Sequence, residues 1–281
     1  MKAGGTVGGG SGRRPGLPHH LFDAYVLDLD GTVYLGDDLL PGAKHTIEQL
    51  RRHRRGVRFV SNNPTRDLEE YAGKLTRLGI PAETGDIVNT VVTMTRWLIE
   101  NAPHATVFPI AEEPLVRALR DAGIRMSEDP AEIDLVIASY DRTFCYRKLQ
   151  IAFDAIRVQG RARLIATNPD PFCPLDGGRG EPDAGAIIAA IEACTGAPLE
   201  VNTGKPDPIM LRAALHGLEV VPSRCVMVGD RLSTDIRMAL DAGMPSMLVL
   251  TGETRPEDLT HLAPQDRPTY VLDTLDQLLP A

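Results

Sequence analysis

The chain has 281 residues, of which 43% are hydrophobic and 24% are charged, as in a globular protein rather than a disordered or collagen-like one. Its 38 acidic residues outnumber its 30 lysines and arginines, and the formal net charge is −8. We expect no nucleic-acid partner, because binding to nucleic acid needs a positive field. The apolar runs are shorter than the roughly 18 residues of a membrane-spanning helix, so we expect no membrane partner either.

The first segment, residues 1–20, is rich in glycine and polar residues and predicts a flexible N-terminal tail. It lacks the apolar stretch of a secretion signal, and we therefore expect a cytoplasmic protein. The 4 cysteines lie far apart without a CxxC pair. This spacing argues against a zinc knuckle or a disulfide framework.

Strands and helices alternate from the first apolar run onward. A predicted strand over residues 24–27 runs directly into Asp28-Leu-Asp-Gly-Thr, as a buried parallel strand ending in a polar loop does. A helix is expected over residues 42–55, closed by Gly56. A second strand, residues 57–60, leads into Ser61-Asn-Asn-Pro, and a helix over residues 67–78 follows.

The middle of the chain has its own alternation and predicts an inserted α/β domain over residues 103–200. Turn-rich segments at residues 101–103 and 195–198 flank it. Its predicted strands are residues 106–109, 135–138 and 164–166, and its predicted helices are residues 113–122, 147–158 and 184–194.

The first pattern resumes near the C-terminus. A strand over residues 225–228 ends in Gly229-Asp230 and precedes a helix over residues 235–242; two further strands are expected over residues 246–250 and 270–272. Strand–loop–helix alternation is typical of a doubly wound parallel sheet. The two outer segments therefore predict one core interrupted by the insert.

Three predicted strand ends carry groups that phosphoryl transfer needs, and ligands of parallel α/β sheets bind at such ends. Asp28 and Asp30 form a plausible pair of nucleophile and acid/base. Two carboxylates so close need a cation, and oxygen ligands favour magnesium. Asp230 adds a third carboxylate, Ser61 a hydroxyl with nearby backbone N–H groups, and Lys205 a cation for phosphoryl oxygens.

Four segments in order, LDLDGT, FVSNN, GKPDP and MVGDRLSTD, match the motifs of the haloacid dehalogenase (HAD) superfamily. From about Tyr25 to Thr254 the chain resembles its HAD-IIA branch, the NagD-like and p-nitrophenyl phosphatase-like enzymes. Further branch features are the runs Tyr71-Ala-Gly-Lys-Leu75, Ile165-Ala-Thr-Asn-Pro-Asp170 and Gly185-Ala-Ile-Ile-Ala-Ala-Ile191.

The resemblance implies an α/β fold: a three-layer Rossmann-like HAD core with a mostly parallel sheet, and an inserted α/β cap domain of the kind found in this branch. The core would comprise residues 21–102 and 201–281, and the cap residues 103–200, between the second and third motifs. This division agrees with the one that the alternation indicates. Homodimers occur in the branch, so a homodimer is a further expectation.

The resemblance also implies roles for the motif residues. Asp28 would be the nucleophile that forms an aspartyl-phosphate, and Asp30 would protonate the leaving alcohol and then activate water. Mg²⁺ would be held by the carboxylates of Asp28 and Asp230 and by the backbone carbonyl of Asp30. Dehalogenating relatives lack a carboxylate at the position of Asp30, so its presence favours a phosphatase.

The remaining motif residues would bind the phosphoryl group or support the site. Ser61 and the Asn62 amide would hold the phosphoryl group, and Lys205 would neutralise its charge in the transition state. Asp235 matches a supporting carboxylate near the metal's waters or Lys205; alternatively it caps a helix together with Thr234. The sequence leaves both roles open.

In this branch the cap selects the leaving group, and the candidate contacts are Asn168, Asp170 and Asp183. An acidic group there would accept hydrogen bonds from sugar hydroxyls and repel a second phosphate, although Asp183 also stands where a helix N-cap belongs. We therefore expect a magnesium-dependent phosphatase of small phosphate monoesters, foremost sugar or polyol phosphates. The alternatives are a phosphatase of nucleoside monophosphates such as UMP and a catalytically idle sensor of phosphometabolites.

Overall fold

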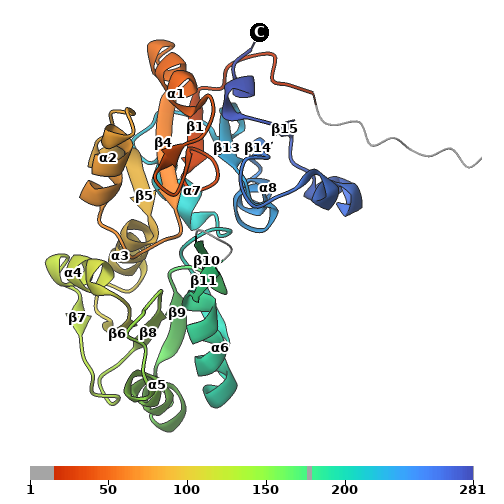
Figure 1. The fold of residues 1–281 in the computed structure, drawn as a ribbon. Helices are drawn as coiled ribbons and strands as arrows, with labels where there is room; N and C mark the ends of the chain where they lie inside the picture. The colour runs from red at the N-terminus through yellow and green to blue at the C-terminus, as the bar shows by residue number, and fades with distance from the viewer. Residues whose placement is uncertain (1–15, 176–178, 281) are drawn as a thin grey trace, which may run out of the picture.

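A computed structural model of the chain describes residues 16–175 and 179–280 (Figure 1). Residues 1–15, most of the predicted tail, lie outside the described residues. The chain forms two parallel sheets, each covered by helices on both faces, so the α/β class expected from the sequence is confirmed. In Figure 1 the core lies above and the cap below.

The core sheet has six parallel strands, and its central strand β1 (Ala24–Asp28) is buried along its whole length. The chain runs outward from β1 on both sides, which makes the carboxyl end of β1 the point where the strand order reverses. The order across the sheet is β15 (Tyr270–Leu272), β14 (Ser246–Val249), β13 (Cys225–Gly229), β1, β4 (Gly56–Ser61) and β5 (Ile87–Asn89).

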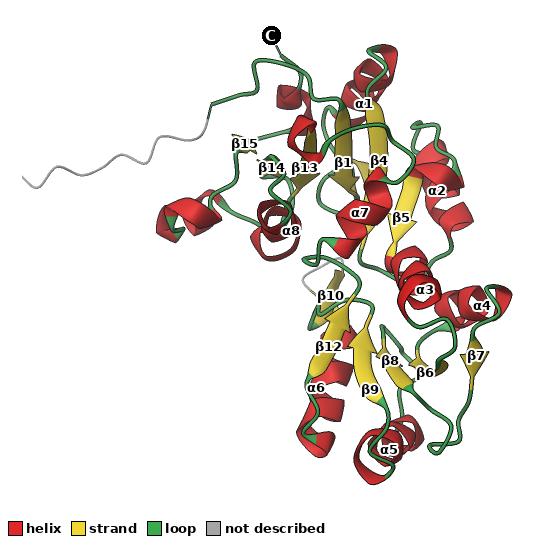
Figure 2. Cartoon of the chain, turned by 180° about the vertical axis from the view of Figure 1, so that it is seen from behind, coloured by secondary structure: helices red, strands yellow, loops and turns green. Residues whose placement is uncertain are grey.

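Helices cover the core sheet on both faces because successive side chains of a strand point to opposite sides. Tyr25 and Leu27 pack against α1 (Ala43–Arg52) and α2 (Leu68–Arg77). Ala24 and Val26 pack on the other side, against α7 (Ile209–Leu215) and α8 (Arg237–Asp241). Figure 2 shows α7 lying over this second face. The result is the three-layer core.

A short antiparallel hairpin follows the first strand of the core. It pairs β2 (Tyr34–Leu35) with β3 (Asp38–Leu39), and Gly36 takes a positive φ of 54° in the turn between them. This hairpin lies next to the carboxyl end of β1, because Asp30 forms an isolated bridge with Tyr34.

The cap sheet has five parallel strands, and helices again cover both faces. Its order is β12 (Leu199–Asn202), β9 (Arg163–Ala166), β8 (Leu135–Ala138), β6 (Thr106–Ile110) and β7 (Arg125–Met126). One face packs on α5 (Tyr146–Phe153) and α6 (Ala184–Thr195), and the other on α3 (Thr90–Asn101) and α4 (Glu113–Asp121). A hairpin of β10 (Phe172–Leu175) and β11 (Arg179–Pro182) precedes α6.

Two elements do not follow the predicted domain limits, which themselves stay a prediction. Helix α3 falls within the predicted core segment, yet Met94 and Leu98 of this helix pack with the buried residues of the cap sheet. Strand β12 runs from residue 199 to residue 202 and so crosses the predicted limit at residue 200. No helix in the described ranges is both long and apolar enough to span a membrane.

Candidate active site

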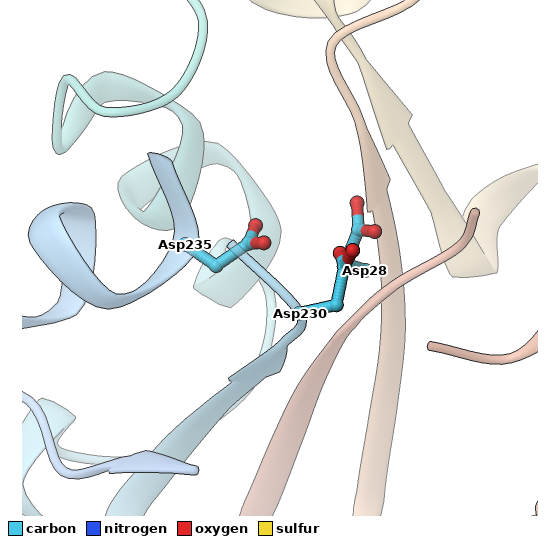
Figure 3. A group of neighbouring side chains, drawn as sticks. All are labelled: Asp28, Asp230 and Asp235. Atoms are coloured by element: carbon cyan, nitrogen blue, oxygen red, sulfur yellow. The ribbon is translucent and has the colours of Figure 1, made fainter. Parts of the chain in front are cut away.

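The carboxylates of the site stand at the ends of the two central strands of the core sheet. Asp28 is the last residue of β1, and Asp230 directly follows β13, the neighbour of β1. Asp235 lies in the helical turn after β13. One carboxylate oxygen from each of the three lies within 4.8 Å of the others, and all three residues are buried (Figure 3).

Lys205 brings a positive charge into this cluster from a distant part of the chain. Its Nζ contacts Oδ1 of Asp28 and donates to Oδ1 of Asp235 at 2.8 Å. Burial alone disfavours the charge on this ammonium, but Asp235 and Asp28 together raise the pKa of Lys205 above its ordinary value. The side chain therefore stays an ammonium beside Asp28.

The carboxylates repel one another, and this repulsion acts on their protonation. Burial raises the pKa of Asp28 well above its ordinary value; Lys205 opposes this effect, and the neighbouring Asp235 and Asp230 add to it. Burial also raises the pKa of Asp230 to about 6, with a further contribution from Asp235. Three acids in one buried space are therefore short of positive charge, even with Lys205 among them.

A divalent cation fits this donor set. Oδ1 of Asp230 is buried and has no hydrogen-bond partner among the described residues, whereas its Oδ2 accepts from the Glu253 amide at 2.7 Å. Two glycines allow the backbone to approach that carboxylate closely. A Cβ on Gly252 would lie 2.0 Å from Asp230 Oδ2, and one on Gly31 would lie 2.5 Å from it. Hard oxygen donors in a buried anionic space are what magnesium prefers.

Asp235 differs from the other two acids because protein groups already use both of its oxygens. Oδ1 accepts from Lys205, and Oδ2 accepts from the Arg231 amide at 3.2 Å, at the start of the helical turn. The contact with Lys205 fits the supporting role, but the predicted helix cap with Thr234 is not formed, because Thr234 Oγ1 has no hydrogen-bond partner among the described residues. This leaves Asp28 and Asp230 as the carboxylates that can take a cation.

Asp30 lies beyond the end of β1, and its side chain reaches solvent. Its carboxylate accepts a hydrogen bond from the Gly36 amide in the β2–β3 turn. The protein atoms around it raise its pKa above the ordinary value by desolvation, although the charges of Lys74 and Arg66 oppose this. A raised pKa favours the protonated form that a general acid needs.

The second strand end supplies Ser61, the last residue of β4, and Asn62 after it. The Asn62 side chain does something that the sequence does not indicate: it holds the backbone of Lys205. Its Oδ1 accepts from the Lys205 amide at 2.8 Å, and its Nδ2 donates to the Lys205 carbonyl at 3.1 Å. Asn62 thus fixes the segment from which the ammonium reaches Asp28.

The cap residues meet the core through the same asparagine. Asn62 Nδ2 donates to Oδ2 of Asp170 at 2.8 Å, and Asn168 donates to this oxygen at 3.3 Å. Asn168 gives its other amide hydrogen to Oδ1 of Asp183 at 3.1 Å. The structure therefore brings all three predicted cap residues into one network, in which Asn168 spends both amide hydrogens on carboxylates.

Asp183 is also the N-cap of α6, where its Oδ1 accepts from the Ala184 amide at 2.5 Å. The structure therefore contains the helix-capping contact that the sequence suggests for Asp183. Oδ2 of Asp183 takes part in neither of these bonds.

Two features of the site have no clear signal in the sequence. The Gly252-Glu253 segment contacts Asp230 from a loop more than twenty residues further along the chain, and only the fold brings it there. The Asn62 clamp joins residues 143 positions apart. The SNN motif contains two asparagines, Asn62 and Asn63, and the sequence does not indicate which of their side chains makes this bond.

Comparison with known proteins places both halves of the core. A family described as haloacid dehalogenase-like hydrolase matches residues 25–125, and one described as HAD-hydrolase-like matches residues 202–278. An acid sugar phosphatase from Staphylococcus haemolyticus is 35% identical over 256 residues, which is 91% of this chain and 94% of that protein.

Solved structures agree in fold over nearly the whole chain. A 4-nitrophenylphosphatase from Thermotoga maritima superposes with a TM-score of 0.85 at 34% identity, covering 92% of this chain and 96% of that one. A glycerol phosphate phosphatase from Mycobacterium tuberculosis in complex with magnesium gives a TM-score of 0.82 at 33% identity, covering 92% of this chain and 76% of that one. Together with the strand-end acids and the lysine beside Asp28, these likenesses show that the chain belongs to the HAD-IIA branch of the haloacid dehalogenase superfamily and is a phosphatase.

Proposed function

We propose that this phosphatase hydrolyses small phosphate monoesters, foremost sugar and polyol phosphates, in a magnesium-dependent reaction through an aspartyl-phosphate on Asp28. The observation that carries the proposal is the Lys205 ammonium in contact with Asp28, next to an Asp230 oxygen without a partner in the described part of the chain. The names of the relatives support the substrate class: one is an acid sugar phosphatase and another a glycerol phosphate phosphatase.

The first step transfers the phosphoryl group to the enzyme. A carboxylate oxygen of Asp28 attacks phosphorus, and the bond from phosphorus to the alcohol oxygen breaks. Protonated Asp30 gives its proton to the departing oxygen, so that the product leaves as a neutral alcohol. The raised pKa of Asp30 favours this protonated form.

The second step returns both acids to their starting states. Asp30, now a carboxylate, takes a proton from water while the water oxygen attacks phosphorus. The bond from phosphorus to Asp28 breaks, inorganic phosphate leaves, and Asp30 is protonated again. Dividing one displacement into two lets a single acid serve as donor and then as acceptor.

Positive charge and hydrogen-bond donors stabilise the phosphoryl oxygens in both steps. Lys205 supplies the fixed charge, and the Ser61 hydroxyl and the backbone N–H of Asn62 supply donors at the end of the neighbouring strand. Asp28, Asp230 and the backbone carbonyl of Asp30 would hold magnesium, which supplies charge that offsets the repulsion between the acids and the phosphoryl group. Asp235 keeps Lys205 in place.

The cap supports a leaving group that carries hydroxyls rather than a second anion. Asp170 receives both of its hydrogen bonds at Oδ2, from Asn62 and from Asn168, which leaves Oδ1 as an acceptor for a substrate hydroxyl. Asp183 adds a second acid, whose Oδ1 lies 3.1 Å from Nδ2 of Asn168. Two acids beside the phosphate site disfavour substrates with another phosphate or a carboxylate. The cytoplasmic location and the homodimer stay predictions.

A phosphate-release screen tests the proposal. It compares sugar phosphates, glycerol phosphates, phosphoglycolate, pyridoxal phosphate and mononucleotides, each with magnesium and with EDTA. We expect sugar or polyol phosphates to be turned over fastest, and activity to disappear with EDTA and in Asp28→Asn. The variant Asp38→Asn, at an exposed position on β3, should keep wild-type activity.

The same screen separates the alternatives. Fastest turnover of nucleoside monophosphates would replace the sugar assignment while leaving the chemistry in place. Tight binding of a phosphometabolite without phosphate release from any substrate would indicate a sensor and contradict the proposal.

A further inference from the structure

The Ser61 hydroxyl has a second neighbour that the proposed mechanism does not use. Ser61 Oγ accepts from the backbone N–H of Asn63 at 3.2 Å and lies 3.2 Å from the hydroxyl of Tyr71. Tyr71 comes from α2 and is 3% exposed, so its ring is part of the core while its hydroxyl meets the loop after β4. The same hydroxyl donates to the Asn63 carbonyl at 3.0 Å.

Counting hydrogens fixes the direction of these bonds. A phenol has one hydrogen, and the Asn63 carbonyl can only accept, so the hydrogen of Tyr71 goes to Asn63. The bond between the two hydroxyls must then be donated by Ser61. Burial raises the pKa of Tyr71 above its ordinary value, so the phenol keeps its hydrogen and this arrangement persists.

This arrangement fixes Ser61 Oγ from two sides and leaves its hydrogen as the mobile part. The Asn63 amide occupies one lone pair, and the Tyr71 oxygen receives the hydrogen. When a phosphoryl oxygen arrives, rotation about one bond turns that hydrogen from Tyr71 toward it, and Oγ need not move. A hydroxyl held in advance loses less rotational freedom on binding.

We propose that Tyr71 is a positioning residue that acts through Ser61, holding its hydroxyl ready to donate to the phosphoryl group. The inference rests on the proposed function in one respect: it takes Ser61 to be a phosphate ligand. It adds a group that touches neither substrate nor metal.

A double-mutant cycle tests this inference, with the affinity for inorganic phosphate measured by calorimetry in the presence of magnesium. The variants are Tyr71→Phe, Ser61→Ala and the double mutant. The control is Tyr25→Phe, which removes another buried tyrosine hydroxyl, one that accepts from the Phe22 amide at 3.0 Å near the start of the core sheet's first strand. Thermal unfolding of each variant checks that the fold is kept.

We expect Tyr71→Phe to weaken phosphate binding about fivefold, the range for one hydrogen bond, and to raise KM more than it lowers kcat. In the Ser61→Ala background the same change should alter affinity by less than about twofold, because the hydroxyl that Tyr71 orients is gone. Tyr25→Phe should leave phosphate affinity unchanged.

An equal loss in both backgrounds would overturn the inference, because Tyr71 would then act through the loop backbone alone. An unchanged affinity in Ser61→Ala would overturn it as well. If Tyr71→Phe does not fold, 3-fluorotyrosine at position 71 keeps the ring but weakens the oxygen as an acceptor; it must then change phosphate affinity only when Ser61 is present. Coupled phosphate binding without turnover of any ester would contradict the proposed function and leave this inference standing.

Discussion

At the scale of single residues, Asp183 caps helix α6 and is also a buried acid whose protonation affects stability. Burial raises its pKa from the ordinary 3.8 to about 6, although hydrogen bonds from Ala184 and Asn168 oppose the shift. The folded chain therefore holds the proton more tightly than the unfolded chain does. The resulting stability is fully present below about pH 3.8 and is lost as the pH rises through about 6.

The variant Asp183→Asn tests this, since it keeps the Oδ1 acceptor but cannot ionise. Relative to wild type, we expect it to gain stability between pH 4 and pH 7, by on the order of 2 kcal/mol. Urea unfolding at both values measures the gain, and Asp38→Asn serves as the control. Wild type and variant changing in parallel would show that Asp183 ionises without a penalty.

The proximity of the strand-end acids could be predicted because parallel strands bring their carboxyl ends to the same edge of a sheet. Asp28 and Lys205 are 177 positions apart in the chain, yet they are in contact in the structure. The Asn62 side chain could not be predicted in the same way. Its partners lie 143 and 108 positions away, and nothing local to the SNN motif selects them.

At the scale of elements, the segment between β12 and α7 connects the cap sheet to Lys205. Strand β12 ends at Asn202, three residues before Lys205, and Thr203 bonds to Ala166 at the end of a cap strand. Gly204 lies in the tightest part of this segment. A Cβ there would be 2.4 Å from the Thr167 carbonyl and 2.8 Å from Asn62 Oδ1.

We therefore expect Gly204→Ala to displace Lys205, lowering kcat at least about tenfold and stability by about 1 to 3 kcal/mol. Gly85→Ala is the matched control, because a Cβ on Gly85 would meet nothing within 4 Å. Steady-state kinetics and urea unfolding of the two variants make the comparison. Wild-type kcat in Gly204→Ala would show that this segment does not position the lysine.

The ends of elements were harder to predict than their existence. The sequence predicts a helix through residue 55 closed by Gly56, but α1 ends at Arg52 and Gly56 already belongs to β4. Arg54 takes the left-handed conformation instead, with φ 54°, and the Arg55 amide bonds back to Leu50. Glycine is the usual residue for this turn, so an arginine there gives no signal in the sequence.

Short elements and mixed helices account for most of the remaining differences. Strands β5, β7 and β12 have two to four residues each, too few for a hydrophobic pattern to appear. The helix predicted over residues 147–158 starts at Tyr146 and becomes a wider π-helical turn over residues 154–158. Helix α3 follows β5 so closely that the pattern showed neither element.

At the scale of the whole molecule, residues of both the core and the cap contribute to the candidate site. The core supplies the acids, the cap supplies Asp170, and Asn62 bonds to both the cap and the Lys205 segment. The presence of two parallel sheets could be predicted because each has its own strand–helix alternation. The contribution of α3 to the cap core could not, because its buried face depends on which sheet lies opposite.

Metal binding should stabilise the whole fold, because the folded chain alone gathers the buried acids. Magnesium at about 100 times its dissociation constant should add about 2.7 kcal/mol and raise the unfolding temperature by several degrees. Asp230→Asn should lose this shift, and Asp38→Asn should keep it. Differential scanning calorimetry with and without magnesium measures it, and an equal shift in Asp230→Asn would place the binding elsewhere.

In the proposed mechanism, Asp28 takes the phosphoryl group and Asp30 is needed to remove it again. Acid quenching of the enzyme during turnover, followed by peptide mass spectrometry, tests this directly. We predict phosphate on the peptide containing Asp28 and none in Asp28→Asn. With p-nitrophenyl phosphate, whose phenolate leaves without a proton, we predict more of it in Asp30→Asn because water is no longer activated. Phosphate on a different residue, or turnover in Asp28→Asn at the wild-type rate, would contradict this mechanism.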